Sequence, residues 1–185
     1  MSDLEIIDKI KAGDHSSFRL LVDKYQALVF RTAVGFVHVK EDAEDLTQEV
    51  FIKIFQSLNT FKGEAEFTTW LYRVSVNTCI NHTNRANRFD LLEFTENIFQ
   101  NMFDKIDNEK NPEQKLIEKE REAKIRKAVD SLPDKQRTVF VLSKYDDLSQ
   151  REIAGIMKIT EGAVEQHLQR AKINLQKKLK KIVGN

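Results

Sequence analysis

Apolar residues recur at intervals of three and four through most of this chain, which is the spacing that keeps side chains on one face of an α-helix. The first such stretch predicts a short helix over residues 2–12, opened by Ser2 and Glu5 as a capping box and ended by Gly13. Asp14 is expected to cap a longer helix that belongs to the core. The buried face of that helix is predicted to consist of Phe18, Leu21, Val22, Tyr25, Leu28, Val29 and Ala33.

The stretch 41–58 predicts a helix with two different faces. One face carries an apolar stripe for the core: Ala43, Leu46, Val50, Ile54 and Leu58. The other gathers long polar side chains around one isoleucine: Asp45, Gln48, Glu49, Ile52 and Gln56. Such a face suits the groove of a partner protein, although an ordinary solvated face with one stray apolar residue has the same composition. The residues alone leave both interpretations open.

A loop containing Gly63 leads into a further helix that begins apolar and ends with amides and arginines. Its predicted core residues are Trp70, Leu71, Val74 and Ile80. Polar residues then recur at three- and four-residue spacing: Asn77, Asn81, Asn84, Arg85 and Arg88. Asparagine is a mediocre helix former, and a surface of Asn and Arg without acids suits base edges and phosphates.

The C-terminal stretch 148–172 predicts two short helices across a tight turn. Ser149 and Glu152 form a capping box for the first helix, and Thr160 is placed to cap the second. The second helix has a polar outer face: Glu161, Glu165, Gln166, Gln169, Arg170 and Lys172. This arrangement is typical of a helix-turn-helix that binds DNA, and the plainer alternative is a helical hairpin packed in an all-α domain.

Composition and charge narrow the fold class and the partners. Only six Gly and two Pro interrupt 185 residues, which favours a nearly all-α protein. The formal net charge is +1, so binding to nucleic acid must rely on local patches. Residues 170–181 hold six basic residues and no acid, whereas residues 89–120 hold nine acids and four lysines. The basic helix can contact phosphates or can be a solvated face.

The same composition argues against an enzyme. His15, His38, His82, His167 and Cys79 are scattered without metal-ligand spacing, and the chain has no Ser/His/Asp or glycine-rich phosphate motif. We therefore predict no catalytic residue, no metal, no cofactor and no small-molecule substrate. A single cysteine, no signal peptide and no long apolar run predict a cytoplasmic protein, with Cys79 packed rather than reactive.

Four segments carry a family resemblance. They are Asp42–Phe51 (DAEDLTQEVF), Phe61–Glu64 (FKGE), Thr69–Val74 (TWLYRV) and the helix-turn-helix. In this order and spacing they resemble an extracytoplasmic-function (ECF) sigma factor of bacterial RNA polymerase, and the match covers nearly the whole chain. The resemblance implies an all-α fold of two small helical domains joined by a linker: 1–88 for core polymerase binding and downstream promoter recognition and melting, 89–114 as a flexible acidic linker, and 115–185 with the helix-turn-helix for the upstream promoter element.

The linker expected at 89–114 contains several large apolar side chains without a sustained helical stripe. These are Phe94, Phe99, Met102 and Phe103. In the family this segment threads through the polymerase, so the side chains are expected to make contacts there or to form a packing patch on one of the domains. The sequence does not choose between the two.

The resemblance also assigns roles to individual residues. The polymerase β′ coiled coil is expected on Asp45, Gln48, Glu49 and Ile52. The loop Phe61, Lys62 and Gly63 is expected to capture a base flipped from the downstream element, with Asn77 and Asn81 beside it and Arg85 and Arg88 on the backbone. The alternative for Phe61 is burial in the core, which is the commoner fate of a lone phenylalanine. The upstream element is expected on Thr160, Glu161, Glu165, Gln166, His167, Gln169, Arg170 and Lys172.

One departure from the family affects the promoter that is read. The family often carries a basic residue where Glu165 and His167 stand. Glutamate accepts a hydrogen bond from a cytosine amino group and repels phosphate, so we expect a non-standard upstream element.

The implied partners are core RNA polymerase (β′ and β), promoter DNA and an anti-sigma factor, which is often membrane-bound in the family. The main alternative is a helix-turn-helix repressor or activator that binds duplex DNA without polymerase. The segment Asp42–Arg88 argues against that alternative, because a simple repressor has no use for it.

Overall fold

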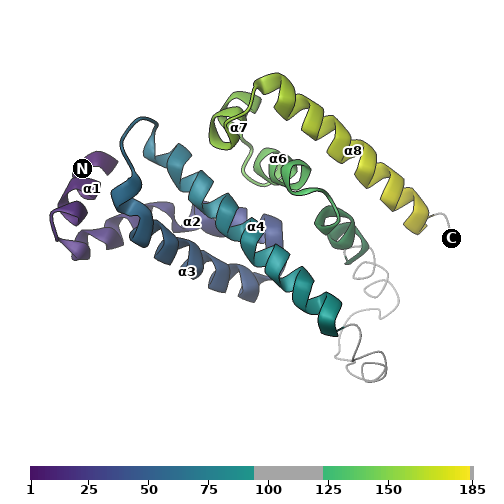
Figure 1. Cartoon of the computed structure of the whole chain (residues 1–185), viewed down its shortest axis with the longest axis horizontal. Helices are drawn as coiled ribbons and strands as arrows, with labels where there is room; N and C mark the ends of the chain where they lie inside the picture. Colours follow the sequence, from purple (N-terminus) through teal and green to yellow (C-terminus); the bar gives the residue numbers. More distant parts are fainter. Residues whose placement is uncertain (94–122, 184–185) are drawn as a thin grey trace, which may run out of the picture.

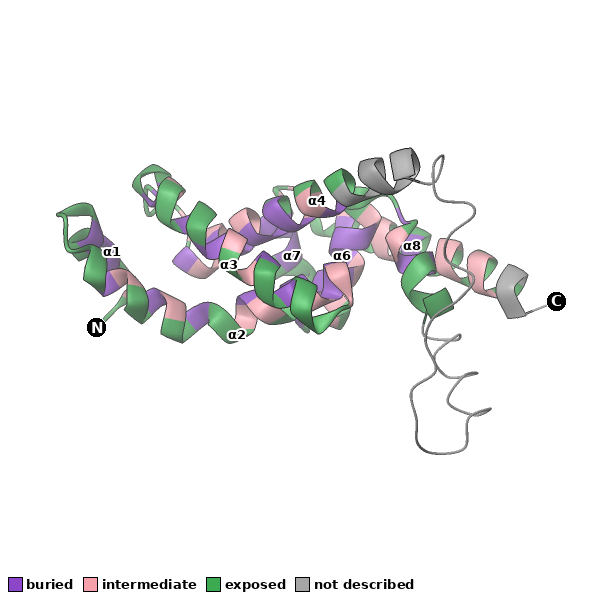
Figure 2. Ribbon diagram, turned by 90° about the horizontal axis from the view of Figure 1, so that it is seen from below, coloured by how far each residue is buried: buried purple, intermediate pink, exposed green. Residues whose placement is uncertain are grey.

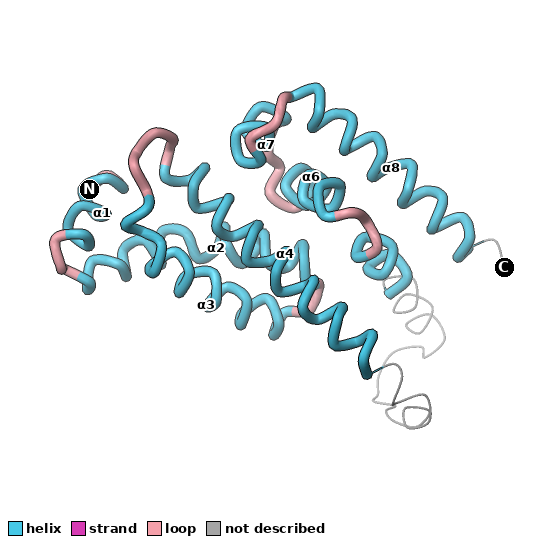
Figure 3. The backbone as a smooth tube through the Cα atoms, viewed as in Figure 1, coloured by secondary structure: helices cyan, strands magenta, loops and turns pink. Residues whose placement is uncertain are grey.

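The computed structural model describes residues 1–93 and 123–183, and every regular element in these two ranges is helical (Figures 1 and 3). Most of the predicted linker, including its four large apolar side chains, lies outside the described residues. The side chain of Arg88 lies outside them as well. The predicted all-α class and helix-turn-helix are therefore confirmed on the described parts of the chain.

The N-terminal region is a helical bundle. Its elements are α1 (Asp3–Lys11), the 3-10 turn η1 (His15–Ser17), α2 (Phe18–Val37), α3 (Lys40–Ser57), the 3-10 turn η2 (Leu58–Thr60) and α4 (Phe67–Glu93). Helices α2, α3 and α4 pack on one another, and α1 lies against the start of α2. The stripe predicted on α3 is buried throughout: Ala43, Leu46, Val50, Ile54 and Leu58. Burial of such stripes is the main force that holds short helices together.

The start of the bundle confirms one predicted cap and corrects another. Glu5 N–H donates to Ser2 Oγ at 3.3 Å, and Ser2 N–H donates to Glu5 Oε2 at 2.7 Å, which completes the predicted capping box. The prediction that Asp14 caps the long helix was wrong. Its carboxylate accepts from the hydroxyls of Ser16 and Ser17 at 2.5 and 2.6 Å and so stabilises η1, which precedes α2.

The C-terminal region comprises a helical stretch at 123–130, followed by α6 (Asp134–Lys144), α7 (Gln150–Met157) and α8 (Glu161–Val183). Figure 1 shows α6 and α7 beside α4, with α8 on the outside. In Figure 2 the buried residues gather on the faces where the helices meet. One of the two hydrophobic cores contains residues from both regions, so the N-terminal bundle and the C-terminal helices are packed together.

Candidate nucleic-acid and partner interfaces

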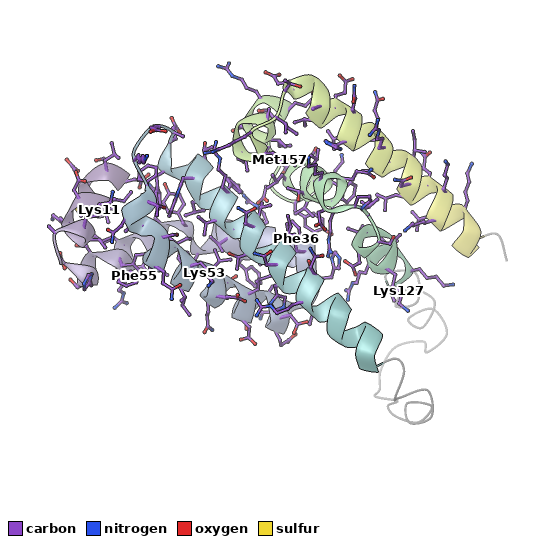
Figure 4. All side chains as sticks on the ribbon, in the orientation of Figure 1. Lys11, Phe36, Lys53, Phe55, Lys127 and Met157 are labelled. Atoms are coloured by element: carbon purple, nitrogen blue, oxygen red, sulfur yellow. The ribbon has the colours of Figure 1, made fainter. Side chains whose placement is uncertain are left out.

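The outer face of α3 presents the side chains that were predicted to meet a partner. Asp45 and Gln48 are exposed, Glu49 is half-buried, and Ile52 is 55 % exposed although it is apolar. Phe55, one turn further on and labelled in Figure 4, is 40 % exposed. Phe55 was not predicted to belong to this face, although its place three residues after Ile52 was the available signal. Two large apolar side chains on one outward face are suited to burial against another protein.

A shallow hollow of about 550 Å³ lies between α2 and α3, next to this outer face. Its lining residues are Gln26, Ala27, Phe30, Lys40, Glu44, Thr47 and Gln48. Gln48 belongs to both the hollow and the exposed face. The arrangement therefore offers a partner a concave apolar surface edged by polar groups.

The loop before α4 holds Phe61 in the interior, not on the surface. Phe61 is only 4 % exposed, and its ring centroid lies 5.5 Å from those of Phe67 and Trp70. Its carbonyl accepts a hydrogen bond of 2.7 Å from Lys11 Nζ, while Lys62 and Gly63 are exposed. Phe61 thus has the position of a core residue, although it also lines a hollow of about 540 Å³ together with Gly63 and Phe67.

The predicted amide and arginine face of α4 is exposed at Asn77, Asn81 and Arg85. Two of its polar groups already have protein partners. Arg85 Nη2 lies 3.5 Å from Glu49 Oε1 on α3, and Asn84 Nδ2 donates to Asp134 Oδ2 on α6 at 3.2 Å. The structure therefore joins the α4 face to the α3 face on one side and to the C-terminal helices on the other.

Asn77 also lines a cleft of about 410 Å³ where α4 meets α6 and α7. The charged groups of this cleft are Arg73, Asp134, Lys135 and Lys158. Met157, labelled in Figure 4, forms part of its apolar lining. The cleft thus places an amide predicted to bind DNA beside groups of the C-terminal region.

The helix-turn-helix has the geometry that its sequence predicts. Ser149 Oγ accepts from Glu152 N–H at 3.3 Å, and the carboxylate of Glu152 accepts from Ser149 N–H at 2.8 Å. The hydroxyl and the N–H of Ser149 both donate to the Glu152 carboxylate, at 2.6 and 2.8 Å, and they lower the pKa of Glu152 because they favour its charged form. Lys158 ends α7 in the left-handed conformation (φ 55°), and Thr160 Oγ1 accepts from Ala163 N–H at 3.2 Å at the start of α8.

The predicted recognition residues lie on the outer face of α8, while Val164 and Ala171 are fully buried. The exposed members are Glu161, Glu165, Gln166, Gln169, Arg170 and Lys172, together with Thr160 in the turn. His167 is half-buried. A helix with this row of polar side chains is compatible with insertion into the major groove of DNA.

Comparison with known proteins identifies the two regions. Residues 21–89 match the family model "Sigma-70 region 2", and residues 122–175 match "Sigma-70, region 4". The chain is 32 % identical over 185 residues to the RNA polymerase sigma-H factor of Pseudomonas aeruginosa, covering 98 % of this chain and 95 % of that protein. The chain belongs to the ECF sigma factors of the sigma-70 family.

A second relative of this sigma factor is the ECF RNA polymerase sigma-E factor of Escherichia coli K12, which is 30 % identical over 186 residues, with 99 % of this chain and 97 % of that protein covered. The fold of the present chain is similar to that of CnrH in complex with the cytosolic domain of CnrY (TM-score 0.61, 22 % identity, 96 % of each chain). It is also similar to RpoE of Bartonella quintana in complex with the anti-sigma factor NepR (TM-score 0.56, 19 % identity, 88 % of this chain and 96 % of that one).

As a member of this family, the chain is a sigma factor of RNA polymerase that acts in transcription initiation. The region 2 match spans α3 and most of α2 and α4, and the region 4 match spans α6, α7 and most of α8. Among residues 1–93 and 123–183, no helix is long and apolar enough to cross a membrane. Within the same residues, no cluster of His, Cys, Asp and Glu is arranged to hold a metal ion.

Proposed function

We propose that this sigma factor binds core RNA polymerase through the outer face of α3. Asp45, Gln48, Glu49 and Ile52 form this surface, and Phe55 extends it. The proposal is supported by the exposure of Ile52 and Phe55 and by the neighbouring apolar hollow. The side chains of this face bind and position the polymerase, and the polymerase carries out RNA synthesis.

We assign residues 1–88 to binding of polymerase and the downstream element, residues 89–114 to a linker, and residues 115–185 to binding of the upstream element. The observation that carries this two-part reading is the presence of separate region 2 and region 4 matches, each on its own set of helices. Each set has its own exposed polar row, one on α4 and one on α8. Two recognition surfaces in one chain suit a promoter with two elements.

For the downstream element we assign Lys62 and Gly63 in the exposed loop, with Asn77, Asn81, Arg85 and Arg88 on α4. The amides donate to and accept from base edges, and the cations contact phosphates. Phe61 contributes by fixing the loop from inside. Its ring is buried against two other aromatic side chains, which agrees with the alternative that Phe61 is a core residue.

For the upstream element we assign the outer row of α8 and the turn before it. This row consists of Thr160, Glu161, Glu165, Gln166, His167, Gln169, Arg170 and Lys172. Gln166 is suited to adenine and Glu165 to the amino group of cytosine, whereas Arg170 and Lys172 are suited to guanine or phosphate. Glu165 on this row supports a non-standard upstream sequence.

Melting of the promoter needs more than these contacts. Separation of about ten base-pair steps costs on the order of 14 kcal/mol at roughly 1.4 kcal/mol per step. One captured base returns about 1–3 kcal/mol. The sigma factor therefore nucleates melting, and contacts between polymerase and the separated strands supply most of the stabilisation.

An anti-sigma factor is a further proposed partner. Two sigma factors of similar fold, CnrH and the Bartonella RpoE, are known in complex with CnrY and with the anti-sigma factor NepR. The exposed apolar residues on α3 provide a surface on which such an inhibitor would compete with polymerase.

Binding to purified core polymerase tests the proposal. Asp45→Ala combined with Gln48→Ala is expected to weaken co-elution with core at least tenfold, while far-UV circular dichroism stays unchanged. Asp8→Ala, an exposed change on the different helix α1, is the control. Equal core binding by all three proteins would contradict the α3 assignment, and nanomolar binding to duplex DNA without polymerase would favour a repressor.

A further inference from the structure

The short helix α1 lies outside the region 2 match, yet it packs against the segment that leads into α4. The match begins at residue 21, whereas α1 covers Asp3–Lys11. Its three buried isoleucines belong to the same hydrophobic core as Phe61 and Phe67. Helix α1 also contacts the turn η2, which leads into the loop 61–66, and Figure 1 shows the two next to each other. This helix is therefore close enough to the loop to hold it in place.

The first end of the loop is bound by Lys11, the last residue of α1, which is labelled in Figure 4. Its Nζ donates a hydrogen bond of 2.7 Å to the carbonyl of Phe61, which lies 50 residues further along the chain. The ring of Phe61 is buried, so this residue is fixed both by aromatic packing and by a charged donor. A charged donor makes a stronger hydrogen bond than a neutral donor does.

The other end of the loop is reached through Asp3, in the first turn of α1. The Asp3 carboxylate accepts hydrogen bonds of 2.6 Å from the Tyr25 hydroxyl and from Lys24 Nζ, both on α2. The Tyr25 hydroxyl also lies 3.4 Å from Thr68 Oγ1, at the start of α4. Burial and the hydrogen bond to Asp3 raise the pKa of Tyr25, so its hydroxyl keeps its proton. Helix α1 is thus connected to the loop at both ends.

Between these two connections, α1 and the loop line the same hollow. Ser2, Asp3 and Leu4, at the start of α1, form one side of the hollow of about 540 Å³. Phe61 and residues 63–68 form the other side. Because the two sides belong to different elements, the shape of the hollow depends on where the loop is held relative to α1.

We propose that Lys11 is a positioning residue, which holds the loop 61–66 in the geometry that captures a base of the downstream element. Lys11 acts through the carbonyl of Phe61 and does not itself contact the base. Asp3 supports the same loop from its other end, through Tyr25 and Thr68. The capture step rests on the function proposed above for the loop, whereas the attachment of the loop to α1 does not.

The hydrogen bond from Lys11 can be removed without a change in the core, because Lys11 is an exposed residue. Lys11→Met keeps an unbranched side chain of high helix propensity and removes the donor, and Lys11→Arg restores a donor. Lys9→Met is the matched control. It removes the same charge from the last turn of the same helix, so the two variants change the interaction with the helix dipole alike.

Fluorescence of Trp70 tests the attachment of the loop. Trp70 is the single tryptophan of the chain, and its ring centroid lies 5.5 Å from that of Phe61. In Lys11→Met we expect acrylamide to quench this fluorescence more strongly, while far-UV circular dichroism stays unchanged. Lys11→Arg and Lys9→Met are expected to match the wild type. Unchanged quenching in Lys11→Met would overturn the attachment, and a loss of helix content would show a structural residue instead of a positioning one.

Promoter opening with core polymerase tests what the attachment does. Loss of a charge-assisted hydrogen bond to the loop is expected to slow opening about tenfold in Lys11→Met, and Lys11→Arg is expected to recover most of the rate. Binding to core polymerase is expected to stay unchanged, because the proposed polymerase surface lies on α3.

Discrimination between bases separates positioning from a general loss of structure. Each position of the downstream element is replaced in turn, and opening rates are compared. At one position, Lys11→Met is expected to discriminate at least about threefold less well than the wild type, with discrimination at the upstream element unchanged. Equal losses at every position of both elements would overturn the positioning role.

Lys62→Ala, an exposed change within the loop itself, distinguishes failure of this proposal from failure of the proposed loop function. If Lys62→Ala slows opening and Lys11→Met does not, the loop takes part in opening and the positioning role of Lys11 is wrong. If neither variant slows opening, the function proposed for the loop is contradicted, and the positioning role with it. In that case the quenching of Trp70 still shows whether Lys11 attaches the loop to α1.

Discussion

Replacement of Phe61 by alanine separates the structural role of the loop before α4 from its recognition role. Phe61 is 4 % exposed and contacts Phe67 and Trp70, with ring centroids 5.5 Å away in each case. Truncation of a buried phenylalanine costs about 3–5 kcal/mol, through lost transfer free energy and the cavity that remains. At roughly 2–4 °C per kcal/mol for a chain of this size, we expect Tm to fall by about 6–20 °C.

The assay is thermal unfolding followed by far-UV circular dichroism, with Lys62→Ala as the matched control. Lys62 is the exposed neighbour in the same loop, so its truncation is expected to change stability by less than about 0.5 kcal/mol. With core polymerase, Lys62→Ala is expected to slow promoter opening without loss of stability. An unchanged Tm for Phe61→Ala would refute the buried position of the ring.

Three further predictions concern the two recognition surfaces and the interface. Lys172→Ala is expected to weaken binding to all upstream-element sequences and to lower the slope of log affinity against log salt by about 0.9. Gln166→Ala is expected to cost about 1–3 kcal/mol of binding free energy on the correct element only. Equal losses for Gln166→Ala on the correct and on a mutated element would show that Gln166 does not read a base. Asn77→Ala is expected to slow opening of duplex promoter DNA and to recover much of the rate on a pre-opened bubble; failure on both templates would make Asn77 structural. Burial raises the pKa of the Asp146 carboxyl, so the folded protein binds the carboxyl proton more tightly than the unfolded chain does. The stability that this proton contributes is present below the ordinary aspartate pKa and is lost as pH rises through the raised pKa. The free energy of unfolding is measured in urea for the wild type and for Asp146→Asn. The wild-type value minus the variant value should decline as pH rises over that window, and a difference that does not change with pH would contradict the prediction.

Local features of the fold were predictable because their causes lie within a few residues of one another. The stripe from Ala43 to Leu58, the capping box of Ser2 and Glu5 and the turn at Lys158 follow from helix period and hydrogen-bonding chemistry. The role of Asp14 was missed because its carboxylate has two hydroxyls within three residues, and these compete with the backbone of α2.

The interface between the regions was not predictable from periodicity. Asp146 and Arg137 have the composition of surface residues, and their burial depends on Arg31 and Phe36, which are 115 and 101 residues away in the chain. Phe61 likewise has no local signal that separates a core ring from a stacking ring. Most residues that were predicted to bind DNA or polymerase lie on the surface. Contacts between the N-terminal and C-terminal regions cover some of them, and these contacts depend on tertiary packing that periodicity does not reveal.

We propose that this sigma factor carries its promoter selectivity in its own two surfaces. The most direct measurement is transcription in vitro from fragmented genomic DNA, with purified core polymerase and with or without this protein, followed by mapping of RNA 5′ ends. We expect a defined set of start sites only when the protein is present. These sites share two upstream sequence elements and are lost with Asp45→Ala plus Gln48→Ala. Identical start sites with and without the protein would contradict it.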